Sequence, residues 1–140
     1  MTPREAFELY CADEMLDTQA HLPFLRESAR GNVLEIGVHT GISTAALLLG
    51  VEEKGGHVWS VDISGQSRYV WHGHPQWTFL HSDSGAVIRQ FAAILPPVFD
   101  LIYIDGGHTY EQVISDLVNL SPLVRPGGLI LLHDVLFTES

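Results

Sequence analysis

Acidic side chains recur along this 140-residue chain at one kind of position, the end of an apolar run. Glu35 lies near the end of the first run, and Asp62, Asp83, Asp105 and Asp134 each stand at or just past the end of a later one. If these runs are parallel strands, their carboxyl ends meet along one crevice, where ligands bind in open α/β sheets. Carboxylates gathered there could accept hydrogen bonds from hydroxyl groups or hold a divalent cation. The alternative is a solvated rim of loops without a ligand.

The stretch 32–44, NVLEIGVHTGIST, combines the first of these acids with a turn that contains Gly37 and Gly41. Ser43 and Thr44 follow, and an apolar helix is expected from there on. A strand, a glycine-bearing turn and a helix start are typical of a nucleotide-type site. Glycine lets the backbone approach a ligand closely, and the N–H groups of a helix start attract anionic groups. The same two-glycine pattern also occurs in turns that are only structural.

The elements that must position these residues alternate along the chain. Strands are expected at 33–36, 57–62, 77–80, 99–104 and 129–134, with a glycine turn at 126–128 before the last. Helices are expected after 44, over 86–95 and from 109 or 110 to about 120, and a short helix and loop over 64–76. Strict alternation predicts a parallel sheet with helices on both faces.

Two further helices are expected before the first strand, and they would form a cover over residues 1–30. Thr2, Pro3 and Glu5 make a capping box that begins the first helix, which runs into the teens. The second spans about 18–29, and Pro23 limits its first turn. This cover either packs on the sheet or acts as a lid over the site.

Composition excludes several classes of function. The chain is 46% hydrophobic, which suits one compact domain over residues 1–140 and argues against disorder. The net charge of −10 disfavours a nucleic-acid partner, and no basic run favours a membrane surface. The single cysteine, Cys11, forms no internal disulfide, and neither a secretory signal nor a membrane-spanning run is present. A cytoplasmic protein acting on a small molecule is therefore expected.

Three stretches carry a resemblance to a known family: VLEIGVHTGIST, VDIS, and FDLIYIDGGHTYEQVISDLVNLSPLVRPGGLILLHD. Together they resemble class I S-adenosylmethionine-dependent methyltransferases (EC 2.1.1.-), in particular the catechol, caffeoyl-CoA-type and family 24 O-methyltransferases. The resemblance implies a Rossmann-like, open, mainly parallel sheet with strand order 3-2-1-4-5 over residues 31–140. It also implies O-methylation of a small hydroxylated molecule such as a sugar or a phenol.

The resemblance further implies which residues bind S-adenosylmethionine. The residues around the first turn would shape the pocket for the methionine moiety, and Ser43 would bind the methionine carboxylate. Asp62 would bind the ribose hydroxyls, and the residues after the second and third strands would contact the adenine. The implied set is Glu35, Gly37, His39, Gly41, Ser43, Asp62, Ile63, Asp83, Ser84 and Asp105. His39 stands where dinucleotide-binding folds usually carry a third glycine, a departure that counts against NAD more than against this family.

A metal and a general base are implied at the other end of the site. Asp105 and Asp134 match positions that hold a divalent cation in the metal-dependent members, and Mg²⁺ would suit two carboxylates. Val135 replaces an asparagine ligand of the catechol-type enzymes, so His133 could supply a ligand instead or face the other side of its strand. His108 falls where those enzymes carry a catalytic lysine, which makes it the candidate base, with Asp105 beside it as a catalytic residue.

Two alternative functions and a second subunit as partner remain open. The chain could be a non-catalytic S-adenosylmethionine-binding module that needs a partner to complete its site. An NAD-dependent enzyme is a second alternative, although His39 and the IDGGH stretch argue against it. The family fold continues with strands 6 and 7, which this sequence lacks. Either the sequence is a trimmed part of a longer chain, or strand 129–134 is an open apolar edge that a homodimer covers.

Overall fold

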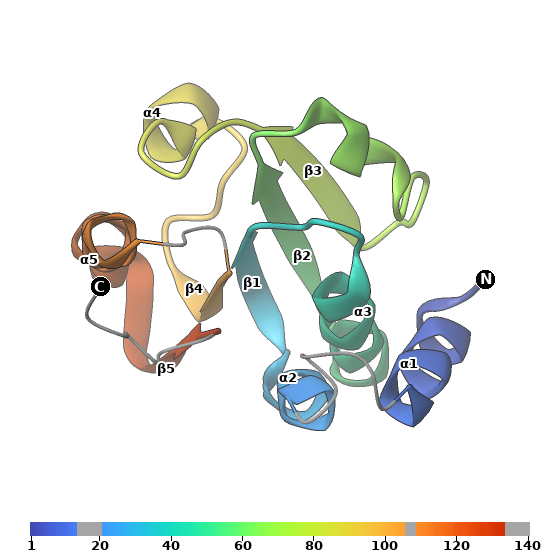
Figure 1. Ribbon diagram of the computed structural model, residues 1–140. Coiled ribbons are helices and arrows are strands. Elements are labelled where there is room, and N and C mark those ends of the chain that lie inside the picture. The colour runs from blue at the N-terminus through green and yellow to red at the C-terminus, as the bar shows by residue number, and fades with distance from the viewer. Residues whose placement is uncertain (14–20, 106–108, 134–140) are drawn as a thin grey trace.

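Five strands form one parallel sheet in the computed structural model, which describes residues 1–13, 21–105 and 109–133 (Figure 1). The strand order is β3-β2-β1-β4-β5, as the resemblance implied. The strands are β1 (Gly31–Ile36), β2 (Gly56–Asp62), β3 (Trp77–His81), β4 (Phe99–Ile104) and β5 (Val124–Leu132). The helices are α1 (Pro3–Ala12), α2 (Leu22–Ser28), α3 (Ile42–Lys54), α4 (Val87–Phe91) and α5 (Tyr110–Leu120), with short 3₁₀ helices η2 (Gly65–Tyr69) and η3 (Ser121–Leu123).

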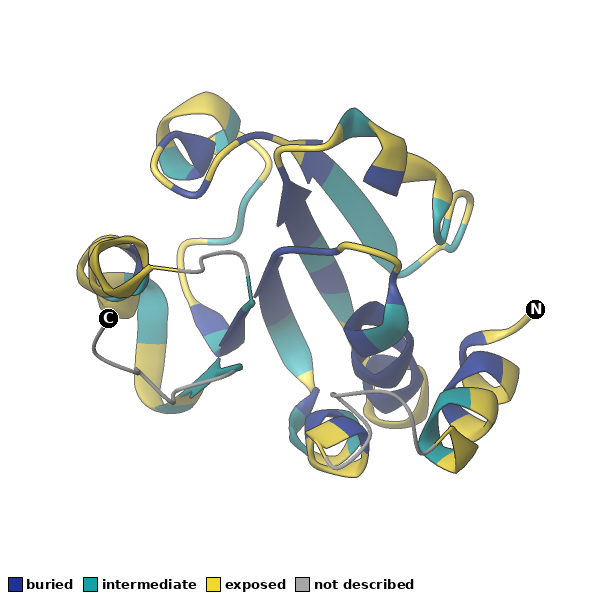
Figure 2. Cartoon of the chain, in the orientation of Figure 1, coloured by how far each residue is buried: buried dark blue, intermediate teal, exposed yellow. Residues whose placement is uncertain are grey.

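The predicted Rossmann-like fold is confirmed, with one hydrophobic core on each face of the sheet. Successive side chains of a strand point to opposite faces, so Val33 of β1 packs beneath α3 while its neighbour Leu34 packs on the other face. The α3 face is covered by α1, α2 and α3, and the opposite core includes Val87 of α4 and Leu120 of α5. Figure 2 shows α3 and the central strands largely buried, whereas α4 and α5 are largely exposed.

The N-terminal cover forms where the structure describes it, but the first helix ends at Ala12 and does not run into the teens as predicted. Thr2 accepts from the backbone N–H of Glu5, and the Glu5 carboxylate accepts in return from the backbone N–H of Thr2, which completes the capping box. The described part of the second helix begins at Leu22, with Pro23 in its first turn. The predicted start at 18–20 lies outside the described residues.

The predicted boundaries of β5 and α4 were wrong as well. Strand β5 begins at Val124 and passes through 126–128, because Val124 pairs with Phe99 and Leu129 with Leu101, so the intervening residues form a bulge rather than a separate turn. Gly128 fits there because a Cβ atom would lie 2.9 Å from the carbonyl oxygen of Asp100. Helix α4 ends at Phe91, whereas the prediction continued it to residue 95. Residues 92–95 continue as turns, in which the N–H groups of Ile94 and Leu95 both donate to the oxygen of Phe91, and the proline at position 96 disfavours helical backbone at Leu95.

Several apolar side chains are exposed at the β5 end of the sheet. The apolar side of α5 is only partly buried, since Ile114 and Val118 are 39% and 66% exposed. In the described chain β5 pairs with β4 alone, and Leu129 is 45% exposed. Self-association at this edge stays a prediction. None of the described helices has the length and apolar character needed to cross a bilayer.

Candidate ligand-binding cleft

A cleft of about 470 Å³ opens at the carboxyl ends of β1, β2 and β3, a volume within the usual range for small-molecule sites. Six of the predicted cofactor-binding residues line it: Gly37, His39, Asp62, Ile63, Asp83 and Ser84. Its other lining residues are Ile36, Val61, Ser82, Thr109, Gln112 and Asp116. Of the acids predicted to meet at this edge, Asp62 and Asp83 line the cleft, whereas Glu35 and Asp105 do not, and Asp134 lies outside the described residues.

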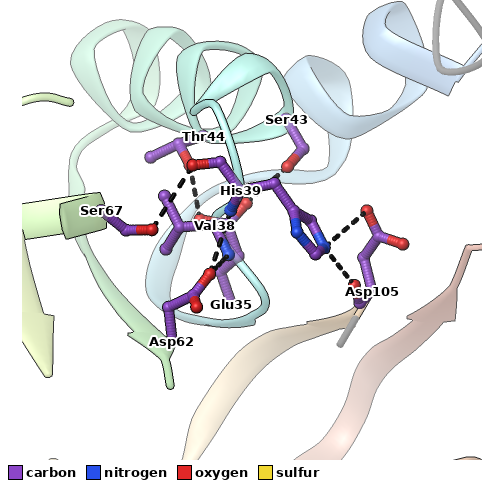
Figure 3. A network of polar contacts seen from close by, with 8 residues as sticks. All are labelled: Glu35, Val38, His39, Ser43, Thr44, Asp62, Ser67 and Asp105. Atoms are coloured by element: carbon purple, nitrogen blue, oxygen red, sulfur yellow. Dashed lines mark hydrogen bonds and ion pairs between the residues drawn. The ribbon is translucent and has the colours of Figure 1, made fainter. Parts of the chain in front are cut away.

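Asp62, at the end of β2, holds the glycine turn that follows β1 (Figure 3). Its Oδ2 accepts from the backbone N–H groups of Val38 (2.8 Å) and His39 (3.0 Å), and its Oδ1 accepts from that of Ser64 (2.8 Å). Burial alone would raise the pKa of Asp62, but these three backbone hydrogen bonds outweigh it and hold the pKa below its ordinary value. The carboxylate is therefore ionised at neutral pH, 9% exposed, and in the wall of the cleft.

His39 adopts the backbone conformation that a third glycine would supply. Its φ is +54°, in the left-handed region that few side chains other than those of asparagine, aspartate and histidine tolerate. Its ring Nε2 lies 2.8 Å from the backbone oxygen of Asp105 and 4.0 Å from the Asp105 carboxylate (Figure 3). The imidazole thus connects the turn after β1 with the end of β4, which a glycine could not do.

Glu35 is fully buried beside the cleft, inside a cluster of hydroxyl groups. Thr44 and Ser60 donate to its Oε1 at 2.6 and 2.8 Å, and Ser43 donates to its Oε2 at 2.7 Å. Burial raises the pKa of Glu35 to about 7, although the three hydroxyl groups counteract part of that effect. Neither Glu35 nor Ser43 is among the residues that line the cleft, so their contact with a cofactor stays a prediction.

Gly41 ends the turn and begins α3, and its surroundings leave no room for a side chain. Its φ is +84°, and a Cβ atom would collide with Val70 and lie 3.0 Å from Trp71 Nε1. Gly73 has an almost identical φ of +85° with no atom within 4 Å of its Cβ position.

These two glycines give a matched pair of variants. We expect Gly41→Ala to lower the free energy of unfolding by about 2–4 kcal/mol, because backbone strain and overpacking add. Gly73→Ala should cost about 1 kcal/mol, the strain alone. Urea unfolding followed by circular dichroism measures both. Equal losses for the two variants would show that the collision with Val70 does not constrain the turn.

Three of the six cleft residues that the sequence reasoning missed lie on α5 or at its N-cap. Thr109 caps this helix by accepting from the backbone N–H of Gln112. Asp116 is 1% exposed and accepts from Ser84 and Gln112, with the Gln112 bond at 3.0 Å. A signal was present, because Asp116 stands three residues after Val113 and four before Leu120 and so interrupts the apolar side of the helix.

The predicted metal and base residues are only partly described. The Asp105 side chain is 20% exposed at the end of β4, and the backbone N–H of His133 donates to the oxygen of Ile104, which places His133 beside that end. His108 and Asp134 lie outside the described residues. Among the residues that are described, no three His, Cys, Asp or Glu side chains gather as a metal site. The cation and the base therefore stay predictions.

A parallel sheet of order 3-2-1-4-5, with an acid and a glycine turn at its carboxyl edge, defines the class of nucleotide-binding α/β domains. Within that class the chain belongs to a methyltransferase family, because the sequence profile of the family 24 methyltransferase domain matches residues 34–135. A search of curated protein sequences found no match.

Solved structures share the fold. MycE methyltransferase from the mycinamycin biosynthetic pathway, in complex with Mg and SAH, superposes with a TM-score of 0.70 at 23% identity, covering 96% of this chain and 39% of MycE. The O-methyltransferase from Bacillus cereus in complex with SAH superposes with a TM-score of 0.66 at 22% identity, covering 91% of this chain and 63% of that enzyme. The SAH-bound methyltransferase PaMTH1 of Podospora anserina superposes with a TM-score of 0.68 at 16% identity, covering 93% of this chain and 60% of PaMTH1. The chain thus spans about two-fifths to two-thirds of the length of these proteins.

Proposed function

We propose that this domain binds S-adenosylmethionine and transfers its methyl group to a hydroxyl oxygen of a small molecule. The observation that carries the proposal is the position of Asp62. An ionised acid at the end of β2, in the wall of the cleft and tied to the turn after β1, is the arrangement that recognises ribose hydroxyls in nucleotide-binding sheets. Membership of the methyltransferase family supports S-adenosylmethionine as the nucleoside.

The chain's own residues would orient the cofactor along the cleft. The Asp62 carboxylate has roughly four acceptor positions, and the three backbone bonds leave about one for a ribose hydroxyl. Ile63 is 76% exposed at the cleft and offers an apolar surface to the adenine ring. Asp83 and Ser84 would approach the edge of the base, and the N-terminus of α3 would face the methionine carboxylate.

The reaction is an in-line displacement at the sulfonium methyl group. The acceptor oxygen forms a bond to the methyl carbon as the carbon–sulfur bond breaks, and the bonding electron pair stays on sulfur. The hydroxyl proton goes to a base, for which His108 is our candidate because it follows the end of β4 in the sequence. Since the methyl group is already activated, the protein mainly supplies orientation, which is worth ~7–11 kcal/mol in favourable cases.

A divalent cation would lower the pKa of the acceptor hydroxyl and fix its position when bound. Asp105 fits such a role, because it offers a partly exposed carboxylate at the end of β4. His133 supports the same location, although Mg²⁺ prefers oxygen ligands to imidazole. Asp134, the second proposed carboxylate, would follow directly.

Calorimetric titration with S-adenosylhomocysteine, beside NAD, tests the cofactor. We expect S-adenosylhomocysteine to bind with a dissociation constant in the micromolar range or below, and we expect NAD to give no heat of binding. Addition of Mg²⁺ with a catechol should then increase product formation, and a strong chelator should abolish that increase. Binding of NAD in place of the nucleoside would contradict the proposal, while activity that survives the chelator would remove only the cation.

A second candidate is a binding module that needs a partner to complete the active site. Binding of S-adenosylhomocysteine without methylation of model catechols or sugars would favour this module. Methylation by the isolated chain would exclude it.

A further inference from the structure

A second pocket lies at the β3 edge of the sheet, and it shares no lining residue with the cleft. In the described chain β3 pairs with β2 alone, so its other side is open (Figure 1). The volume of this edge pocket is about 440 Å³. None of its lining residues is acidic, although the chain has 17 acidic residues and only 7 basic ones. Its side chains are three aromatic rings, one arginine and two histidines: Arg68, His72, Trp77, Phe79, His81 and Phe91.

The aromatic side of the edge pocket is held in place from within the sheet. Trp77 and Phe79 stand two residues apart on β3 and therefore on the same face, and their ring centroids are 5.8 Å apart. Both side chains are half-buried. The indole N–H of Trp77 donates to Ser60 Oγ at 2.8 Å. Because the single polar atom of the indole is bound inside the protein, Trp77 offers the pocket a fixed hydrocarbon surface, which suits a flat apolar group.

The polar side of the edge pocket carries a positive charge without an acidic partner among the described side chains. Three other arginines form ion pairs with acids, whereas no ion pair between described residues includes Arg68. The Nε of Arg68 donates to the backbone oxygen of Gly65 at 2.7 Å, which orients the guanidinium group and leaves its two terminal nitrogens for a ligand. His81 lies close by, because its Cε1 and the Nη2 of Arg68 both approach the Cβ position of Gly65, at 3.3 and 2.8 Å.

We propose that the edge pocket is a second ligand site, separate from the cleft, and that it binds a planar aromatic carboxylate. The carboxylate would pair with Arg68, because a guanidinium group presents parallel N–H groups that match the two oxygens of a carboxylate. The ring of the ligand would lie against Trp77 and Phe79. An aromatic cation would be repelled by Arg68, and an aliphatic acid would lose the contact between rings. The inference goes beyond the proposed function, since it assigns a different part of the molecule.

Calorimetric titration of the full chain with 2-naphthoate tests the site, in the absence and in the presence of excess S-adenosylhomocysteine. We expect one molecule to bind under both conditions, with a dissociation constant of about 1 mM or below. The neutral isostere 2-naphthamide should bind at least about fivefold more weakly, because it lacks the charge that pairs with Arg68. Phe79→Leu keeps an apolar side chain but removes the ring, so it should weaken the binding of 2-naphthoate about threefold.

Arg68→Gln should lower the affinity for 2-naphthoate at least about fivefold and remove the preference for the acid over the amide. Arg89→Gln is the matched control, since it removes an exposed arginine that does not line the edge pocket, and it should bind as the wild type does. Equal affinity of the wild type for acid and amide, or no binding at about tenfold higher concentration, would overturn the inference. Unchanged affinity in Arg68→Gln would overturn it as well.

Displacement of 2-naphthoate by S-adenosylhomocysteine would place the ligand in the cleft and would also overturn the second site. Failure of the chain to bind S-adenosylhomocysteine would contradict the proposed function alone, because the binding of 2-naphthoate and its loss in Arg68→Gln are measured without the nucleoside.

Discussion

Replacing Glu35 with glutamine is expected to remove a fall in stability that the wild-type protein shows as pH rises from about 4.5 to about 7. Burial raises the folded-state pKa of Glu35 to about 7 from an ordinary 4.5, so the native state binds the extra proton between these values. Stability is then fully present below the unfolded-state pKa and is lost as pH rises through the folded-state pKa. A shift of this size corresponds to about 3 kcal/mol.

Glutamine reproduces the protonated carboxyl group at every pH. Its amide oxygen can accept from Thr44 and Ser60 as Oε1 does, and its NH₂ can donate to Ser43, whose hydroxyl can rotate. Urea unfolding of both proteins between about pH 5 and 8 measures the effect. The wild type minus variant difference should fall by about 3 kcal/mol over that range, and groups common to both, such as His57, cancel from it.

Glu8→Gln, on the exposed side of α1, is the control and should follow the wild-type curve at every pH. A constant difference between wild type and Glu35→Gln would mean that Glu35 is ionised throughout. In that case the three hydroxyl groups would stabilise the charge more strongly than burial disfavours it.

Replacing Asp62 with alanine should reduce both stability and cofactor affinity, because one carboxylate serves the turn and the cleft. The substitution leaves the backbone N–H groups of Val38, His39 and Ser64 without their acceptor. A buried N–H group that loses its acceptor lowers the free energy of unfolding by about 1–3 kcal/mol. Because water can reach the less buried of these three groups, we expect the free energy of unfolding to fall by about 3 kcal/mol in total. Affinity for S-adenosylhomocysteine should fall by a further ~1.5–3 kcal/mol, the scale of a charge-assisted hydrogen bond.

The variant Asp62→Asn distinguishes the role of Asp62 in holding the turn from its role in binding the ribose. Its amide oxygen can keep the bonds from Val38 and His39, while its NH₂ cannot accept from Ser64, so stability should fall by about half as much as in the alanine variant. Calorimetry at a temperature where both variants are folded measures the affinity. If Asp62→Ala is destabilised but binds with wild-type affinity, Asp62 holds the turn and does not bind the ribose.

The sequence predicted the sheet order through the family resemblance, and it predicted the strands through their apolar runs. It failed at boundaries where pairing with a neighbour outweighs local preference. The glycines at 127 and 128 favour a turn locally, but β4 pairs with Val124 on one side of them and Leu129 on the other, so strand β5 continues through a bulge. No pattern in the local sequence predicts which residues of β4 and β5 pair with each other.

The site divides in the same way. The positions of Asp62 and Asp83 at the ends of strands were enough to predict that they share a cleft, because a parallel sheet brings those ends together whatever packs around them. Ile63 and Ser84 were predicted from the family resemblance, and they line the same cleft. Three matters needed the tertiary structure: that Glu35 is enclosed by hydroxyl groups, that His39 takes a left-handed conformation, and that Asp116 faces Ser84. The first depends on how α3 packs against the sheet, the second on the contacts of the turn with Asp62 and Asp105, and the third on how α5 packs. All of these contacts join residues that are distant in the sequence or lie on different elements.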